Sequence, residues 1–276
     1  MLGPAQRGHY AVGAFNYCNF ETAQAVVEAG MALRSPVMYI TAPWETSLLG
    51  PEAVVEVARY VAARADVPVC LHLDHATDVE SVKECIEAGF PSVMIDASAH
   101  DFEENVRMTR AVVDMARPAG ITVEAELGAV GRVDDATVEG SDGNSLTDPD
   151  MAAEFVRLTG VDALAVAIGN AHGIYTQQPE LDLARLDRIR AAVSVPLVLH
   201  GGSGTPSDQL RRAIEIGISK VNVASELSRA YLNAIQQAVA QSDGKIWYVS
   251  ALIDAKKAVT EVVERWMAKL GSAGKC

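Results

Sequence analysis

The sequence Val69-Cys70-Leu71-His72-Leu73-Asp74-His75 decides the fold, because a short apolar run ends in a carboxylate beside an imidazole. The run is too short for a helix and alternates apolar residues with His72 and Asp74, which predicts a buried strand. A buried unpaired charge is costly, so Asp74 and His75 are expected at an open strand end where they can bind something. These residues alone leave a structural alternative open. The histidine could be a core residue with its hydrogen bonds satisfied, and the aspartate could cap the following helix.

Similar apolar runs recur along the chain, and each is followed by a helical pattern. The predicted strands cover residues 11–16, 36–41, 67–74, 92–96, 122–127, 163–168, 196–199 and 220–223. The predicted helices cover residues 21–33, 51–64, 79–88, 102–116, 150–158, 183–192, 207–216, 227–239 and 251–270, and residues 42–45 are expected as a loop. This alternation favours an α/β fold, a closed (β/α)8 TIM barrel.

An open doubly wound sheet is the alternative, but no G-x-G-x-x-G follows the first strand. The sequence has no convincing internal boundary, so residues 1–276 are expected to form a single domain with an extra C-terminal helix.

The composition excludes several classes of partner. The net charge is −13 without a Lys/Arg-rich run, which argues against nucleic acid and against an anionic membrane surface. No stretch approaches the roughly 18 apolar residues of a membrane span, and residues 1–9 lack the layout of a signal peptide. The scattered cysteines form no metal motif and no disulfide framework, so a cytoplasmic location is expected.

Polar side chains gather at the predicted strand ends, where the active site of such a barrel lies. They are Asn16, Asp74, His75, Asp96, Ser98, Glu124, Glu126, Asn170, His172, His200, Asn222 and Ser225. His75, His172 and His200 follow three different strands. Three imidazoles from separate rigid elements, with an open fourth position, are typical of a catalytic zinc site. A chance scatter of histidines is the alternative.

Two loops carry further hypotheses. The stretch Gly201-Gly-Ser-Gly204 exposes backbone N–H groups that can hold a phosphate, although a tight turn before Pro206 would also explain the glycines. The segment 128–145 is long for a loop between strand and helix, and such loops are often lids. A disordered surface excursion is the alternative for that segment.

Several motifs in order resemble one family, the class II, zinc-dependent ketose-bisphosphate aldolases, which contains the fructose- and tagatose-bisphosphate enzymes. The resemblance runs nearly end to end. The motifs are Leu71-His-Leu-Asp-His75, Val123-Glu-Ala-Glu-Leu-Gly128, Leu164-Ala-Val-Ala-Ile-Gly169, Ala171-His-Gly-Ile-Tyr175, Pro196-Leu-Val-Leu-His-Gly-Gly-Ser-Gly204 and Lys220-Val-Asn-Val223.

The resemblance implies a role for each matching residue. His75, His172 and His200 match the zinc ligands, and Glu126 matches a glutamate that joins the metal in some members. Asp74 matches the general acid/base. In the family, a further set of positions holds the dihydroxyacetone-phosphate half of the substrate; the matching residues here are Gly173, Gly201, Ser203, Asn222 and Ser225. Asn16 is a further substrate-binding candidate. Carbonyls near Gly173 and Gly201 match a monovalent-cation site, for Na+ or K+.

The implied chemistry is that zinc polarises the C2 carbonyl of a ketose while Asp74 removes the C4 hydroxyl proton, so that the C3–C4 bond breaks. A carboxylate on a mobile loop then handles the proton on the three-carbon fragment. Lys220 at a strand end is the competing nucleophile for a Schiff base. A structural role is favoured for it, because the three histidines explain more.

The chain departs from the family pattern on its substrate side. Asp134 stands where relatives carry a lid glutamate, so it is the candidate second catalytic residue. Ala224 replaces an aspartate, as in tagatose-type members, and Ala42 replaces a serine or threonine. Ile253 falls where relatives supply a basic residue for the distal phosphate, with Lys256 and Lys257 close by.

These residues predict a zinc-dependent aldolase that cleaves a phosphorylated ketose, closer to the tagatose type, and that assembles as a dimer or tetramer. One alternative is an aldolase for a related acid, deoxy or sulfonated sugar phosphate with a different distal group. Another is a barrel that binds sugar phosphate without turnover.

Overall fold

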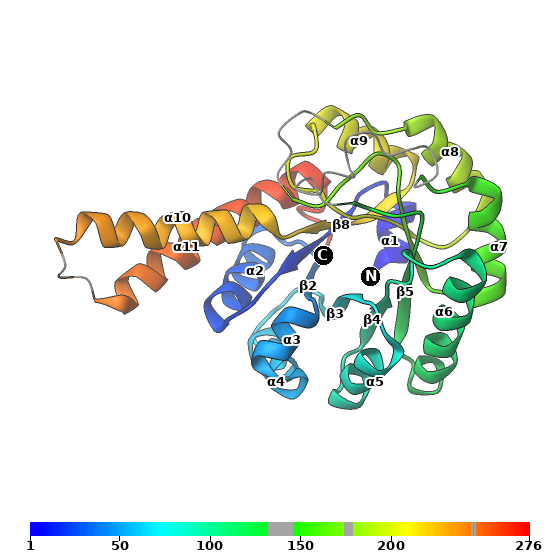
Figure 1. Ribbon diagram of the computed structural model, residues 1–276. Coiled ribbons are helices and arrows are strands. Elements are labelled where there is room, and N and C mark those ends of the chain that lie inside the picture. Colours follow the sequence, from blue (N-terminus) through cyan, green and yellow to red (C-terminus); the bar gives the residue numbers. More distant parts are fainter. Residues whose placement is uncertain (132–145, 174–178, 244, 246) are drawn as a thin grey trace.

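A closed barrel of parallel strands forms the centre of the computed structural model, which describes residues 1–131, 146–173, 179–243, 245 and 247–276 (Figure 1). Each strand pairs with the next in sequence, and β8 pairs with β1. The strands are β1 (Val12–Asn16), β2 (Val37–Thr41), β3 (Val69–Ala76), β4 (Ser92–Ile95), β5 (Thr122–Leu127), β6 (Ala163–Val166), β7 (Leu197–Leu199) and β8 (Ile218–Val223). The predicted TIM barrel is confirmed.

Helices surround the barrel and lie close to the predicted ranges. They are α1 (Leu2–Arg7), α2 (Phe20–Leu33), α3 (Pro43–Leu49), α4 (Pro51–Ala62), α5 (Val79–Ala88), α6 (Phe102–Ala116), η1 (Arg117–Ala119), α7 (Pro149–Thr159), α8 (Leu183–Ala192), α9 (Ser207–Ile216), α10 (Ser225–Gln241) and α11 (Tyr248–Leu270).

The expected loop at residues 42–45 is wrong, because α3 begins there. Pro43 takes the first helical position, where its missing N–H costs nothing. The Glu45 carboxylate accepts a hydrogen bond of 2.8 Å from the backbone N–H of Ala42, which completes the N-terminal cap. Helix α1 was not predicted either; its Ala5 packs in one cluster with Val12 inside the barrel.

The strands are buried on both faces, as expected for a parallel sheet covered by helices. Outward-facing residues such as Val93 and Ile95 pack in the main hydrophobic core beneath the helices. Inward-facing positions of β3, β5 and β8 carry His72, Glu124 and Lys220, each at most 2 % exposed. The barrel interior below the mouth is therefore polar, and its groups need partners from neighbouring strands.

A bulge near the end of β3 sets up the site. The register of β3 against β4 shifts between Leu73 and Ala76, and His75 adopts a left-handed φ of 49°. Successive residues of a regular strand point to opposite faces, so Asp74 and His75 could not both reach the mouth without this irregularity. Such strain in a residue other than glycine is typical of functional sites.

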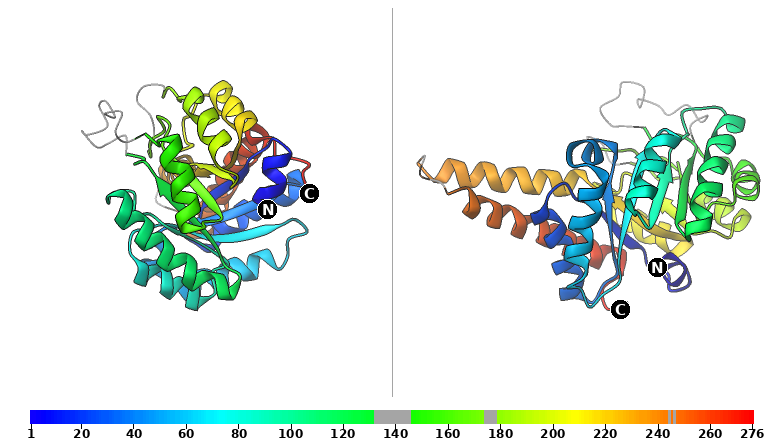
Figure 2. Two further views of the ribbon diagram at one scale, coloured as in Figure 1. Left: turned by 90° about the vertical axis from the view of Figure 1, so that its right-hand side faces the viewer. Right: turned by 90° about the horizontal axis from the view of Figure 1, so that it is seen from below.

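The two C-terminal helices form an arm, defined here as α10 and α11, that projects from the barrel (Figure 2). The predicted extra C-terminal helix is confirmed as the second half of this arm. The arm and Trp247, the residue just before α11, carry large apolar side chains that are exposed in the single chain. They are Leu232, Val239, Trp247, Tyr248, Val249 and Ile253. Among the described residues, no helix combines the length and hydropathy that crossing a membrane requires.

Candidate metal centre and active site

Three histidines converge at the mouth of the barrel, as the sequence predicts. The ring centroid of His75 lies 4.6 Å from that of His172 and 4.5 Å from that of His200. Nitrogens of the three rings lie within 4.8 Å of one another, and His75 Nε2 is 2.8 Å from His200 Nδ1. Unlike the isolated motifs, this geometry brings lone pairs from three separate segments to one point, which is the arrangement a metal ion needs.

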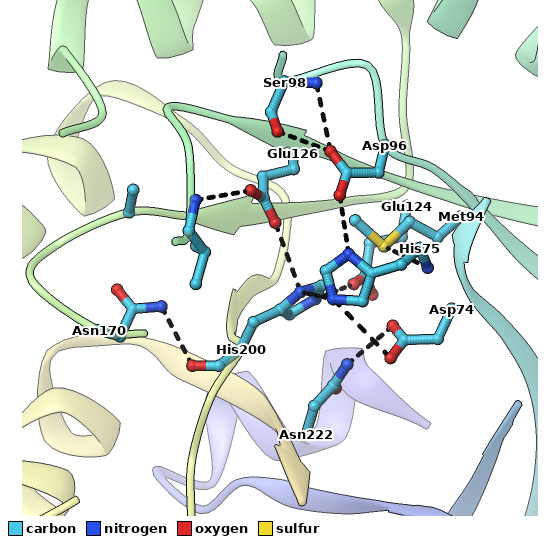
Figure 3. A network of polar contacts seen from close by, with 12 residues as sticks. Asp74, His75, Met94, Asp96, Ser98, Glu124, Glu126, Asn170, His200 and Asn222 are labelled. Carbon is cyan, nitrogen blue, oxygen red and sulfur yellow. Dashed lines mark hydrogen bonds and ion pairs between the residues drawn. The ribbon is translucent and has the colours of Figure 1, made fainter. Parts of the chain in front are cut away.

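A carboxylate backs two of these imidazoles (Figure 3). Asp96 Oδ2 lies 2.7 Å from His75 Nδ1, and Glu124 Oε1 lies 2.9 Å from His200 Nε2. The Asp96 carboxylate is itself held by the N–H and hydroxyl of Ser98. With the outer nitrogen of each ring donating to a carboxylate, the inner nitrogen keeps its lone pair for a ligand, and the ring orientation is fixed.

Glu126 supplies an oxygen beside the three nitrogens. Its Oε2 lies 3.4 Å from His200 Nδ1 and has no hydrogen-bond partner among the described residues, although it is buried. Its Oε1 accepts a bond of 3.0 Å from the N–H of Val130. Burial, and then the nearby Asp96 charge, raises the pKa of Glu126 to about 8. An orphaned carboxylate oxygen beside three imidazoles fits a divalent metal such as zinc.

The electrostatics of the imidazoles differ from ring to ring. Burial lowers the pKa of His75, but Asp74 and the bond to Asp96 outweigh it and raise that pKa to about 9. Burial, followed by the repulsion of His75, holds the pKa of His200 well below its usual range. The surrounding carboxylates thus attract a positive charge to this point, which either a proton or a metal ion can supply.

A buried ion pair lies directly beneath the metal centre. Lys220 Nζ is 2.8 Å and 3.0 Å from the two oxygens of Glu124, and Lys220 is fully buried. The ammonium is therefore engaged by a carboxylate that also holds His200, which supports the structural role favoured for Lys220. His72 lies beneath the centre, where its Nδ1 is 2.7 Å from Ser92 Oγ.

Asp74 stands beside the histidines and faces the same space. It is 7 % exposed, and its Oδ2 lies 4.0 Å from His75 Nε2. Asn222 Nδ2 donates a bond of 2.8 Å to Asp74 Oδ1, which fixes the carboxylate. The Oδ1 of Asn222 is buried and has no partner among the described residues, so it can accept a hydrogen bond from a ligand.

The glycine loop differs from the expected open cradle. The N–H of Gly202 donates to the carbonyl of Asn222, and the N–H of Gly204 donates to Glu226. Gly201 has a φ of +62°, and a Cβ there would lie 2.0 Å from the Ala171 carbonyl oxygen, so close backbone packing explains this glycine. The N-terminus of α10 lies against this loop, because the N–H of Glu226 donates a bond of 3.4 Å to Ser203 Oγ.

The remaining predicted residues are spread around the mouth. Asn16 ends β1, Ser225 begins α10, and Gly173 follows His172. The backbone N–H of His172 donates to the carbonyl of Gly131, which ties the start of the long loop to a metal-ligand candidate. Asp134 lies outside the described residues.

Two residues emerge from the structure with roles that the sequence analysis did not give them, Glu124 and Asp96. Both appeared among the polar strand-end residues, but nothing in a one-dimensional pattern shows which imidazole a carboxylate will contact. The alternation of Glu124 with Glu126 along β5 was the available signal, because it places both side chains inside the barrel.

A sequence profile of class-II fructose-bisphosphate aldolases matches residues 1–275. The chain belongs to this family. It is a class II aldolase, a lyase of a metal-dependent family, on an eight-stranded barrel.

Solved structures agree with this assignment. The YdjI aldolase from Escherichia coli K12 is 39% identical, with a TM-score of 0.88 over 99% of this chain and 96% of that one. A candidate fructose-1,6-bisphosphate aldolase from Coccidioides immitis is 34% identical, with the same TM-score and the same coverage. The fructose-bisphosphate aldolase of Campylobacter jejuni, 21% identical with a TM-score of 0.83 over 100% of this chain and 94% of that one, shares the fold.

The carboxylate behind His75 gives a direct prediction. Asp96→Asn removes the acceptor charge that orients the imidazole, so zinc affinity should fall about 10–100-fold. Competition with a chromophoric chelator measures the zinc dissociation constant. The matched control is Asp114→Asn, because Asp114 lies on an exposed face of α6 in a pair with Arg110. Equal zinc affinity in Asp96→Asn and the control would contradict the assigned role.

Proposed function

We propose that the chain is a zinc-dependent aldolase that reversibly cleaves a ketose phosphate, such as tagatose- or fructose-1,6-bisphosphate, to dihydroxyacetone phosphate and an aldehyde. The family supports the reaction class. The observation that carries the proposal is the position of Asp74, a fixed carboxylate within 4.0 Å of a nitrogen in the three-histidine cluster. A base at that distance can act on a substrate atom next to the one that the metal holds.

The proposed chemistry uses residues in distinct roles. His75, His172 and His200 would hold the metal, with Glu126 as an alternate ligand. When bound, the metal supplies Lewis-acid polarisation of the C2 carbonyl. Asp74 takes the proton of the C4 hydroxyl, the C4–O bond becomes the carbonyl of the aldehyde, and the electron pair of the C3–C4 bond stays with the three-carbon fragment.

The three-carbon fragment must then gain a proton on C3, and Asp134 is the proposed donor. Asp74 is suited to its own step because Asn222 fixes its orientation through a bond of 2.8 Å. The free Oδ1 of Asn222 can accept a hydrogen bond from a hydroxyl of the substrate.

The phosphate of the three-carbon half is proposed to bind between β7 and β8, where barrels of this kind often hold phosphate. Ser203 and Ser225 lie there, and the N-terminal dipole of α10 favours an anion. Gly173 and Gly201 complete this set, and carbonyls near them are proposed to hold Na+ or K+.

The candidate substrates differ in the group at their distal end, away from the three-carbon half. Ala224 supports a tagatose-type preference, because tagatose-type members resemble the chain at that position. A ketose phosphate with a different distal group is the second candidate, and the buried Glu45 carboxylate near Asn16 favours it.

Release of dihydroxyacetone phosphate tests the proposed reaction. Zinc-loaded protein should release it from tagatose- or fructose-1,6-bisphosphate, lose this activity after chelation, and regain it when zinc is restored. A coupled assay that reduces the product with NADH measures the rate. Activity that survives complete removal of metal, verified by elemental analysis, would contradict the metal-dependent mechanism.

Replacement of Asp74 tests the general base. Asp74→Asn should lower kcat about 10²–10⁴-fold, because an amide cannot accept the C4 hydroxyl proton. Zinc content should stay at the wild-type level, since Asp74 is not a proposed ligand. Asp187→Asn, on an exposed position of α8, is the control for loss of a carboxylate. Full activity of Asp74→Asn would contradict the mechanism.

We also infer that the chain assembles as a dimer or tetramer in the cytoplasm. The exposed apolar residues of the arm support assembly, because such residues in a monomer are normally scattered singly rather than gathered on one element.

Sedimentation velocity tests the assembly. The wild-type protein should sediment as a multiple of the 29.3 kDa chain, and Ile253→Lys should shift it toward the monomer by placing a charge on the arm. Leu48→Lys, at a 76 % exposed position on α3, is the control. A monomeric wild-type protein at micromolar concentration would contradict the inference.

A further inference from the structure

We propose that Glu45 makes the far end of the active site prefer a ketose phosphate whose distal group is an uncharged hydroxyl over one that carries a second phosphate there. This inference rests on the proposed aldolase function and narrows its substrate class. It concerns a carboxylate that the proposed reaction itself does not use.

Glu45 lies at the mouth of the barrel, the end at which the candidate catalytic residues gather. Asn16 ends β1 and lies two residues beyond Ala14, which pairs with Asn222 on β8. Side chains two residues apart share a face of the strand, so Asn16 lies on the inner face, one level above Ala14. Glu45 is in the first turn of α3, directly after β2. The contact between Asn16 and Glu45 therefore lies at the same end of the barrel as Asn222 and Asp74.

Both oxygens of the Glu45 carboxylate accept hydrogen bonds. Asn16 Nδ2 donates to Oε1 at 3.2 Å, and the backbone N–H of Ala42 donates to Oε2 at 2.8 Å. The residue is 8 % exposed. Burial raises the pKa of Glu45, and these two donors oppose the rise by stabilising the anion. The carboxylate is thus a fixed acceptor in the wall of the mouth.

This contact determines which atom of Asn16 faces a substrate. A carboxylate accepts hydrogen bonds and cannot donate, so the amide NH2 of Asn16 must turn toward Glu45. The other atom of the amide, Oδ1, is then left for a ligand, and no donor among the described residues reaches it. Asn16 itself is half-buried at the end of β1. A hydroxyl can donate to that oxygen, whereas a phosphate dianion would meet an acceptor with a carboxylate behind it.

The direction of the substrate brings its far end to this wall. The proposed phosphate site lies between β7 and β8, and Asp74 on β3 acts at C4. Toward β4 and β5, the mouth is occupied by Asp96 and Glu126, which contact the histidines. The substrate carbons beyond C4 therefore extend toward β1 and β2, where Asn16 and Glu45 lie.

Glu45→Gln should reverse the preference. The Gln side chain can still accept the N–H of Ala42 through its oxygen, while its NH2 donates to Asn16 Oδ1. Asn16 would then turn its NH2 to the substrate, giving up the weak contact of 3.5 Å that Nδ2 makes with the Ile40 carbonyl, and the buried negative charge would be gone. A hydrogen bond to a charged group is worth enough to change selectivity about tenfold or more.

The test compares kcat/KM for tagatose and fructose 1-phosphates with kcat/KM for the corresponding 1,6-bisphosphates, using zinc-loaded full-length protein. The wild type should prefer the monophosphates, and Glu45→Gln should raise the bisphosphate-to-monophosphate ratio at least about tenfold. Glu52→Gln, which removes the same charge from an exposed position on α4, should leave the ratio unchanged.

Several outcomes would overturn the inference. A wild-type preference for the bisphosphates would do so even if Glu45→Gln failed to fold, and so would an unchanged ratio in folded Glu45→Gln. If the wild type cleaves both substrate types but prefers the bisphosphates, this inference fails and the proposed aldolase function stands. Cleavage of neither would overturn the proposed function and this inference with it.

Discussion

The buried ion pair between Glu124 and Lys220 is the constraint on which the site depends. Glu124 contacts His200 from inside the barrel, and a lone carboxylate buried there would be strongly disfavoured. Lys220 supplies the compensating charge from β8, at 2.8 Å and 3.0 Å from the two carboxylate oxygens. Loss of one partner from such a pair costs about 3–5 kcal/mol, so the barrel interior and the metal centre are linked energetically.

The fold was predictable from the sequence because barrel strands give strong local signals. Runs such as residues 122–127 and 92–96 are apolar on the outer face and bounded by turn residues, and the ranges match within a few positions. The helix over Pro43–Leu49 was missed because its first turn, with a proline, has the composition of a loop. Its N-terminal cap depends on the Glu45 side chain turning back to the backbone N–H of Ala42. A cap of that kind is a contact, which sequence spacing suggests but does not establish.

The convergence of His75, His172 and His200 was also predictable, since the closed barrel brings strand ends together. The carboxylates behind them were not, because Asp96 and Glu124 reach their partners across strands and the chosen rotamers decide the contact. The glycine loop shows how the fold narrows a prediction. Its N–H groups read as a phosphate cradle, but Gly202 and Gly204 donate to groups within the protein, and only folding in three dimensions reveals those acceptors.

The central claim is that three histidines from different strands hold one catalytic metal. X-ray diffraction from crystals of zinc-loaded protein, collected on both sides of the zinc absorption edge, tests it most directly. One strong anomalous peak is expected about 2.0–2.1 Å from a ring nitrogen of each of His75, His172 and His200. A zinc peak elsewhere in the molecule, with none between these three rings, would contradict the account.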